Sequence, residues 1–126
     1  MSILVVDDDA GIRQLLTVFL EHNGYHAMSV PNGLEALTYL HNSLDLPQLI
    51  LLDLMMPVMD GAEFRRAQEE DPRLAPIAVV VMSAAENIQA QAPTLTADAY
   101  IPKPIDFDVL LPLVEQYCGQ RRQQGI

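Results

Sequence analysis

Short apolar runs alternate along the chain with longer segments in which apolar residues recur every three or four positions. Residues 3–6 and 49–52 are apolar throughout, which is typical of strands buried on both faces of a parallel sheet. Residues 77–82 have the strongest strand character, while 26–30 are less apolar and are expected nearer a sheet edge. The pattern predicts five strands, at residues 3–6, 26–30, 49–53, 77–82 and 99–101.

The segments between these runs carry apolar stripes at helical spacing, which predict helices packed with one face on the sheet. The inward stripes are Ile12, Leu15, Leu16, Phe19 and Leu20 in the first helix, Leu34, Leu37 and Leu40 in the second, and Phe107, Leu110, Leu111, Val114, Tyr117 and Cys118 in the last. Asn32 with Glu35, and Asp60 with Glu63, have the spacing of helix-starting capping residues. Asn23-Gly24 is expected to end the first helix, and Asp71-Pro72 the third.

Two prolines disturb this pattern. Pro93 interrupts a weak helical stretch that begins near Glu86, so the conformation of residues 86–96 stays open. Pro112 lies inside the last predicted helix, where a proline costs about 3 kcal/mol unless the helix kinks.

Five strands that alternate with five helices predict a parallel sheet with helices on both faces and right-handed crossovers. The expected fold is therefore a doubly wound α/β fold, a flavodoxin-like (βα)5 arrangement with strand order 2-1-3-4-5. Ligands of such sheets bind at the carboxyl ends of the strands, where the strand order reverses between the first and third strands.

Composition narrows the possible partners. The chain has 126 residues, with 17 acidic and 7 basic side chains and a net charge of −10, which argues against nucleic acid or an anionic membrane as a partner. Neither a signal peptide nor a membrane-spanning stretch is visible, so a cytoplasmic location is expected. Cys118 is the only cysteine and is expected to be a small buried residue. Residues 1–120 are predicted to form one domain, and residues 121–126 a polar tail.

Three carboxylates are expected to meet at the switch point of the sheet. Asp7 and Asp8 follow the first strand directly, and Asp53 ends the third. Carboxylates this close repel one another unless a cation neutralises them, and Mg²⁺ prefers oxygen ligands of this kind. Asp9 is interpreted as a solvent-facing or helix-capping residue, not as a third metal ligand.

Two further strand ends suggest what the metal serves. Ser83 brings a hydroxyl and Lys103 an ammonium to the same edge, which completes a set suited to binding a phosphoryl group. Asp53 would then be a nucleophile that forms an acyl phosphate. Asp53 alone would be interpreted as a loop-capping residue and Ser83 alone as an ordinary strand end, so the prediction depends on the whole set.

The complete pattern resembles the receiver domain of two-component response regulators over nearly the full chain. The resemblance rests on four motifs: Val-Val-Asp-Asp-Asp at 5–9, Leu-Leu-Asp-Leu-Met-Met-Pro at 51–57 with Asp60-Gly61, Met-Ser-Ala at 82–84, and Ala-Tyr-Ile-Pro-Lys-Pro at 99–104. Each motif is weak alone, whereas all four in this order and at these separations are specific.

The resemblance implies a role for each matching position. Asp53 would accept a phosphoryl group from a sensor histidine kinase or a histidine phosphotransfer protein. Asp8 would bind Mg²⁺ directly, Asp7 would hold metal-bound water, and the backbone carbonyl of Met55 would complete the protein's ligands. Ser83 and Lys103 would bind phosphoryl oxygens, and Tyr100 would be the aromatic residue that reorients, although without the resemblance it is interpreted as a core aromatic.

The resemblance also implies a switch and not an enzyme, beyond assistance to its own phosphorylation and dephosphorylation. A downstream effector protein, or an output domain outside these residues, would read the surface near Tyr100. Met55 and Ala85 would flank the path of the attacking water, and neither can orient it, so slow self-dephosphorylation is expected. The methionines Met55, Met56 and Met59 are interpreted as adaptable packing residues and not as part of a cofactor site. His22, His26 and His41 are interpreted as surface or packing residues away from the site.

Two alternatives stay open. The first is a degenerate receiver that binds proteins without phosphorylation, although neither the acidic residues nor the lysine is lost. The second is an aspartate-nucleophile phosphatase, whose usual second Asp is replaced here by Met55. Two departures from the family pattern, Thr96 in place of a glycine and a segment from Ser83 to Lys103 that is about two residues short, concern the expected output surface.

Overall fold

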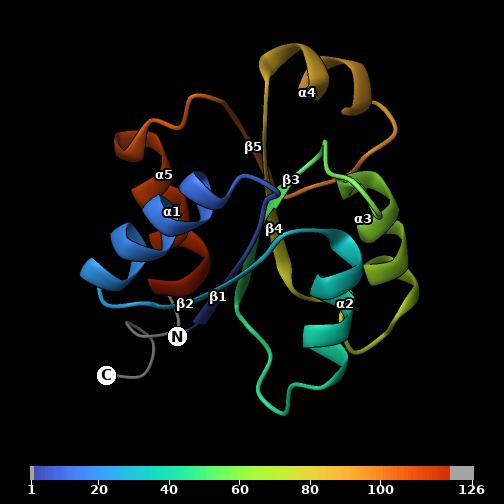
Figure 1. Cartoon of the computed structure of the whole chain (residues 1–126), viewed down its shortest axis with the longest axis horizontal. Helices are drawn as coiled ribbons and strands as arrows, with labels where there is room; N and C mark the ends of the chain where they lie inside the picture. The colour runs from blue at the N-terminus through green and yellow to red at the C-terminus, as the bar shows by residue number, and fades with distance from the viewer. Residues whose placement is uncertain (1, 120–126) are drawn as a thin grey trace.

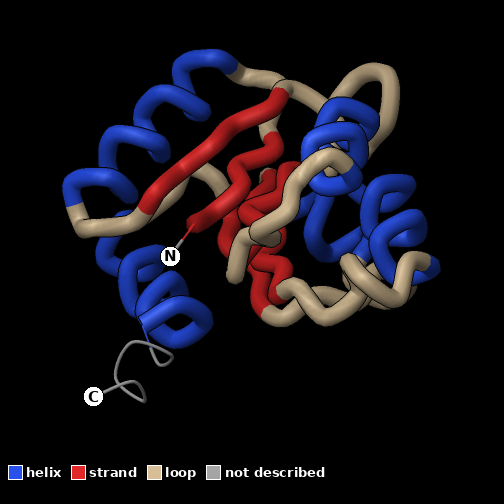
Figure 2. Tube along the Cα trace, turned by 90° about the horizontal axis from the view of Figure 1, so that it is seen from below, coloured by secondary structure: helices blue, strands red, loops and turns tan. Residues whose placement is uncertain are grey.

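The computed structural model describes residues 2–119, which form a five-stranded parallel sheet with helices on both faces (Figures 1 and 2). The strands are β1 (Ser2–Val6), β2 (His26–Val30), β3 (Leu49–Asp53), β4 (Ala78–Ser83) and β5 (Ala99–Pro102). The helices are α1 (Ala10–His22), α2 (Gly33–His41), α3 (Gly61–Glu70), α4 (Ala85–Gln91) and α5 (Phe107–Val114), and a π-helix, η1 (Glu115–Gly119), continues α5. The predicted polar tail, residues 121–126, lies outside the described residues.

The strand order is β2-β1-β3-β4-β5, and every neighbouring pair is parallel, which confirms the predicted doubly wound fold. The less apolar β2 is an edge strand, as its sequence indicates. Because β1 pairs with both β2 and β3, the chain changes direction across the sheet between β1 and β3. All five strands point the same way, so their carboxyl ends form one edge.

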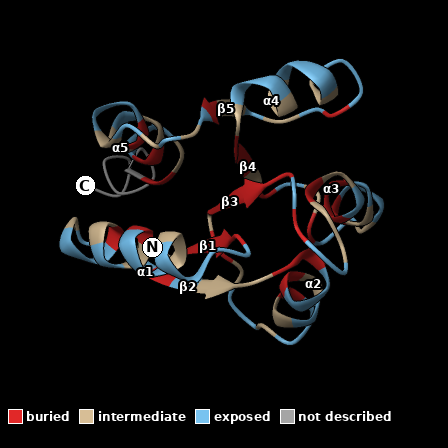
Figure 3. Ribbon diagram, turned by 45° about the horizontal axis from the view of Figure 1, so that its top comes forward, coloured by how far each residue is buried: buried red, intermediate tan, exposed pale blue. Residues whose placement is uncertain are grey.

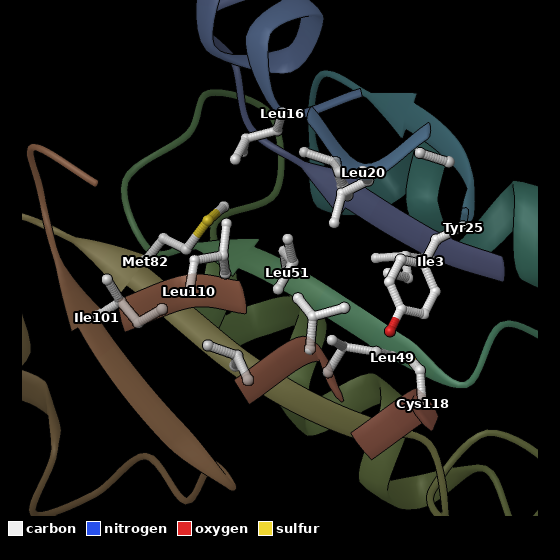
Figure 4. Close-up of a cluster of buried hydrophobic side chains, with 14 residues drawn as sticks. Ile3, Leu16, Leu20, Tyr25, Leu49, Leu51, Met82, Ile101, Leu110 and Cys118 are labelled. Carbon is white, nitrogen blue, oxygen red and sulfur yellow. The ribbon is translucent and has the colours of Figure 1, made fainter. Parts of the chain in front are cut away.

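The two faces of the sheet carry separate hydrophobic clusters. Helices α1 and α5 cover one face, and α2, α3 and α4 cover the other (Figure 3). In the first cluster Leu20 of α1 and Leu110 of α5 meet Leu51 of β3, and all three side chains are buried (Figure 4). Cys118 closes this cluster, and burial raises the pKa of its thiol to about 11.

The buried apolar face of each of these helices is narrower than the sequence predicts. Leu15 and Leu34 were expected to face inward, yet they are 55% and 50% exposed. Leu111 is only half-buried and lies outside both clusters, while Leu113 packs against the first. A short helix covers only part of the sheet, so residues at the shoulder of its apolar stripe remain in solvent. Leu15 lines a hollow of about 210 Å³ between α1 and the residues that follow β5.

The predicted helix ends are confirmed by their hydrogen bonds. The Asp9 carboxylate caps α1 by accepting from the backbone N–H groups of Gly11 and Ile12. Asp60 and Glu63 form the reciprocal capping box at the start of α3. The Asn32 side chain accepts from the Glu35 N–H at the start of α2, and Gly24, with φ of 91°, follows the C-cap of α1.

Pro93 and Pro112 lie near points where a helix ends or changes its type. Helix α4 ends at Gln91, before Pro93, and none of its residues is buried. Pro112 lies inside α5, and three residues later the α-helix gives way to the wider π-helix η1. A π-helical turn after a missing backbone N–H changes the helical repeat without ending the helix.

Within residues 2–119, none of the helices combines the length and the apolar character required to cross a membrane.

Candidate functional site

The predicted site residues lie side by side at the carboxyl edge of the sheet. Asp7 follows β1, Asp53 and Ser83 end β3 and β4, and Lys103 follows β5. These four strands are consecutive neighbours in the sheet, and Asp53 pairs with Met82, one residue before Ser83. The fold therefore brings together side chains that are up to 96 residues apart in sequence.

The three predicted carboxylates form one acidic cluster, defined by Asp7, Asp8 and Asp53. One oxygen from each lies within 4.8 Å of the others. Asp7 and Asp53 are buried, at 0% and 4% exposure, whereas Asp8 is exposed. Two carboxylates thus lie beneath the surface, and the third faces the solvent from which a cation would arrive.

Lys103 bridges the two buried carboxylates. Its Nζ lies 2.8 Å from Asp7 Oδ2 and 3.4 Å from Asp53 Oδ2. Its backbone N–H donates to the Ser83 carbonyl at 2.8 Å, which joins the segment after β5 to the end of β4. Lys103 is also the only lysine in the chain, so no neighbouring lysine can replace its charge.

The charges in the site do not balance. Burial is the main cause that raises the pKa of Asp53, and the negative charge of Asp7 adds to it, while Lys103 opposes both. Burial by itself favours neutral Lys103, but bonds and charge interactions with Asp7 and Asp53 raise the pKa of its ammonium overall. Lys103 thus pairs with two of the three carboxylates of the acidic cluster. An oxygen-rich cluster with excess negative charge fits a hard divalent cation such as Mg²⁺.

Met55 follows Asp53 by two residues, and Ala85 follows Ser83 by two residues. Met55 is 54% exposed, and Ala85 is the exposed first residue of α4. The side-chain amide of Gln91, at the end of α4, donates to the Met55 sulfur over 3.8 Å. Neither Met55 nor Ala85 carries a group that could orient a water molecule strongly.

Tyr100 combines core packing with a polar contact. The side chain is half-buried against the second hydrophobic cluster, and its hydroxyl donates to the Leu95 carbonyl at 2.5 Å. Tyr100 pairs with Val81, two residues before Ser83, and side chains two residues apart on a strand share a face. Tyr100 and Ser83 therefore lie on the same face of the sheet, on neighbouring strands and offset by two residues.

Sequence reasoning did not identify three side chains that support this region. Arg13 donates to the backbone carbonyl of Asp7 at 2.7 Å, Gln91 contacts Met55, and Arg65 of α3 bonds to the segment before β5. Each contact joins elements that are distant in sequence or ends on a backbone atom, so no sequence motif predicts it. The expected roles of Asp9 as a helix cap and of His22, His26 and His41 as exposed residues outside the acidic cluster are confirmed.

The loop from Asp53 to α3 contains a strained residue. Val58 has a φ of 71°, and the Met59 N–H donates to the Pro57 carbonyl at 2.8 Å, which closes a γ-turn around Val58. A β-branched residue rarely adopts positive φ, and strain of this kind costs about 1–3 kcal/mol. Val58 is 75% exposed, so little packing would be lost with its side chain.

We expect Val58→Gly to raise the free energy of unfolding by about 1 kcal/mol. Glycine adopts positive φ without strain, although its greater freedom in the unfolded chain cancels about 0.5–1 kcal/mol of the gain. Val58→Ala keeps a Cβ and serves as the control, with a smaller gain. Urea denaturation of the three proteins measures the difference, and a Val58→Gly protein less stable than wild type would show that the turn is not strained.

Comparison with known proteins gives a consistent result. The family model described as "Response regulator receiver domain" matches residues 3–115. The chain is 40% identical to an uncharacterized 14.6 kDa protein in the sodA1 3′ region of Leptolyngbya boryana, over 94% of this chain and 90% of that protein. It is 33% identical to response regulator Rre1 of Synechocystis, over 97% of this chain and 53% of that protein, so it spans about half the length of that relative.

Solved structures give the same result. The crystal structure of the signal receiver domain of a signal transduction histidine kinase from Syntrophus aciditrophicus superposes with a TM-score of 0.85. The sequence identity is 31%, and the match covers 94% of this chain and 90% of that one.

Proposed function

The chain belongs to the response regulator receiver domain family of two-component signalling, and from that premise we propose that it is a switch controlled by phosphorylation of Asp53. The observation that carries the proposal is the position of Asp53, buried at the end of β3 with Lys103 3.4 Å away and Ser83 at the next strand end. A carboxylate, an ammonium and a hydroxyl at the ends of neighbouring strands support this proposal.

The chemistry of the proposed step follows from these side chains. A carboxylate oxygen of Asp53 attacks the phosphorus of a phosphohistidine, an O–P bond forms, and the P–N bond to the histidine breaks. Negative charge on the phosphoryl oxygens is stabilised by the Lys103 ammonium and by the Ser83 hydroxyl. Lys103 would exchange part of its contact with Asp7 and Asp53 for the phosphoryl group.

The acidic cluster is suited to hold Mg²⁺ during this step. Asp8, Asp53 and the backbone carbonyl of Met55 would be its protein ligands, and Asp7 would hold metal-bound water. Bound Mg²⁺ supplies positive charge that offsets the repulsion between the carboxylates and the incoming phosphoryl group. Burial, and after it the charge of Asp7, raises the pKa of Asp53, and a bound cation would oppose both effects by favouring the ionised carboxylate.

The proposed partners are those of a signalling switch and not the substrates of an enzyme. A sensor histidine kinase or a histidine phosphotransfer protein would donate the phosphoryl group in the cytoplasm. An effector protein, or an output domain outside these residues, would read the surface that includes Tyr100 and α4. In this proposal Ser83 moves toward the phosphoryl group, and Tyr100 leaves the Leu95 carbonyl to fill the vacated space.

The central test is phosphorylation by acetyl phosphate. With Mg²⁺ the wild-type chain should form one phosphorylated species on a Phos-tag gel, and Asp53→Asn should abolish it, because an amide cannot form an acyl phosphate. Chelation of the metal with EDTA should also prevent labelling. Asp45→Asn, which changes an exposed acid outside the acidic cluster, is the matched control and should be labelled normally. Labelling of Asp53→Asn, or a wild-type chain that is never labelled, would contradict the proposed function.

A further inference from the structure

A buried arginine on α3 holds the segment between α4 and β5. Arg65 is only 9% exposed, its Nε donates to the Thr96 carbonyl at 2.8 Å, and its Nη1 donates to Gln68 Oε1 at 2.8 Å. Figure 1 shows this segment passing beside α3 on its way to β5. Hydrogen bonds from a charged donor are stronger than neutral ones, so this contact defines where the Thr96 carbonyl lies.

Gln68 makes Arg65 part of a rigid group. Its side chain is fully buried, and its amide nitrogen donates to the carbonyls of Leu74 and Ile77, in the segment that leads into β4. Arg65 is therefore held by a residue that is itself bonded to the backbone before β4. A guanidinium fixed in this way positions what it binds, because little freedom remains for it to follow a moving loop.

The contact with Thr96 bears directly on Tyr100. The carbonyl next to Thr96 is that of Leu95, and it accepts the Tyr100 hydroxyl at 2.5 Å. Two consecutive carbonyls are thus held by two side chains, one from α3 and the other from β5. The two carbonyls lie in adjacent peptide planes that meet at the Cα of Thr96, so a displacement of Thr96 that breaks the bond to Arg65 also moves one end of the plane that carries the Leu95 carbonyl. The bond to Arg65 therefore restricts where the Leu95 carbonyl can lie relative to Tyr100.

We propose that Arg65 is a positioning residue for the Tyr100 switch, and that it stabilises the arrangement in which Tyr100 bonds to Leu95. The placement of Tyr100 is a property of the resting protein. Only the consequence for phosphorylation rests on the proposed function. If Tyr100 must leave Leu95 when Asp53 is phosphorylated, Arg65 favours the unphosphorylated state, and by linkage its loss favours phosphorylation.

The first experiment measures the environment of the Tyr100 ring in the unphosphorylated protein. The aromatic ring resonances of Tyr100, assigned with Tyr100→Phe, are compared by NMR in wild type, in Arg65→Met and in Arg66→Met. Arg66 is the exposed neighbour on the same helix and serves as the matched control. We expect Arg65→Met to shift the Tyr100 resonances and Arg66→Met to leave them unchanged. Unchanged resonances in Arg65→Met would overturn the inference.

The second experiment measures the rate of phosphorylation by acetyl phosphate and Mg²⁺. We expect Arg65→Met to be phosphorylated about three- to tenfold faster than wild type, which lies within the range of coupling found for residues that contact neither site. In a Tyr100→Phe background, which lacks the hydroxyl, the same change should have no further effect. An equal acceleration in both backgrounds would show that Arg65 acts on the rate without Tyr100, and the inference would fail.

A folding control accompanies both experiments. Arg65→Met leaves the Thr96 carbonyl and Gln68 without a donor, so circular dichroism must first show that the variant is folded. If it is not, Arg65→Lys is used, because an ammonium reaches one acceptor but cannot match the two-pronged bond; it should give a smaller shift and acceleration. A chain that is never phosphorylated would contradict the proposed function while the NMR result still decides the role of Arg65.

Discussion

Replacing Gly61 with alanine is expected to lower the free energy of unfolding by about 2–4 kcal/mol and to slow phosphorylation of Asp53. A Cβ at position 61 would lie 2.4 Å from the carbonyl oxygen of Asp53 and 2.8 Å from the Cα of Leu54. Both are backbone atoms at the end of β3 and in the residue after it, and the Gly61 N–H donates to the Leu54 carbonyl at 2.9 Å. The clash can therefore be relieved only by moving the start of α3 away from Asp53.

Gly11→Ala separates this effect from helix propensity. Gly11 also lies in the first turn of a helix, but its Cβ would meet only the flexible carboxylate of Asp9, at 3.2 Å. Alanine is favoured over glycine in a helix by about 0.8–1.0 kcal/mol, so Gly11→Ala should be neutral or stabilising. Thermal and urea denaturation compare the two variants. If Gly61→Ala is as stable as Gly11→Ala, the close approach of α3 to Asp53 does not require glycine.

Removal of the only lysine should destabilise the protein in a way that depends on pH. Lys103→Met leaves Asp7 and Asp53 buried without their cation, which we expect to cost about 1–3 kcal/mol at pH 7. The variant should also be phosphorylated more slowly, because the phosphoryl oxygens lose a positive partner. Adding Asp7→Asn removes the second buried charge and should restore much of the lost stability.

The sign of the pH effect follows from the pKa of Asp53. That pKa is already raised above its ordinary value of 3.8 by burial and by Asp7, and without Lys103 only the backbone hydrogen bond from Met55 is left to lower it. Between pH 3.8 and the raised pKa the folded state binds more protons than the unfolded state, so stability falls as the pH rises through this window. The difference in the free energy of unfolding between Lys103→Met and wild type should be largest at neutral pH and should disappear below pH 3.8. A gap independent of pH would point to lost packing of the lysine stem.

The sequence predicts strand order and site because its strongest signals are local. Apolar runs that end on charged or hydroxyl residues indicate where the strands stop, and in a parallel sheet those stops must lie along one edge. The sequence therefore predicts that Asp7, Asp53, Ser83 and Lys103 lie together. Helix caps such as Asp60 with Glu63 are predicted for the same reason, since both partners lie within one turn.

The contacts that the sequence does not predict are those between distant elements. Helical periodicity shows which side of α1 faces inward but not how wide the covered stripe is, so Leu15 was wrongly expected to be buried. The bond from Arg65 to the Thr96 carbonyl joins residues 31 apart and ends on a backbone atom, which any residue type could supply. Such contacts depend on the exact path of the loop between α4 and β5, which short-range sequence patterns do not specify.

The burial of Cys118 has a practical consequence for fluorescence studies of this chain. Its thiol lies inside the first hydrophobic cluster with a pKa of about 11, so at neutral pH it is neither accessible nor ionised for reaction with maleimides. Because there is no second cysteine, a single new thiol at exposed Ala90 on α4 would be the one site that takes up a dye. A dye at that position would report on the surface of α4 without the native cysteine having to be removed.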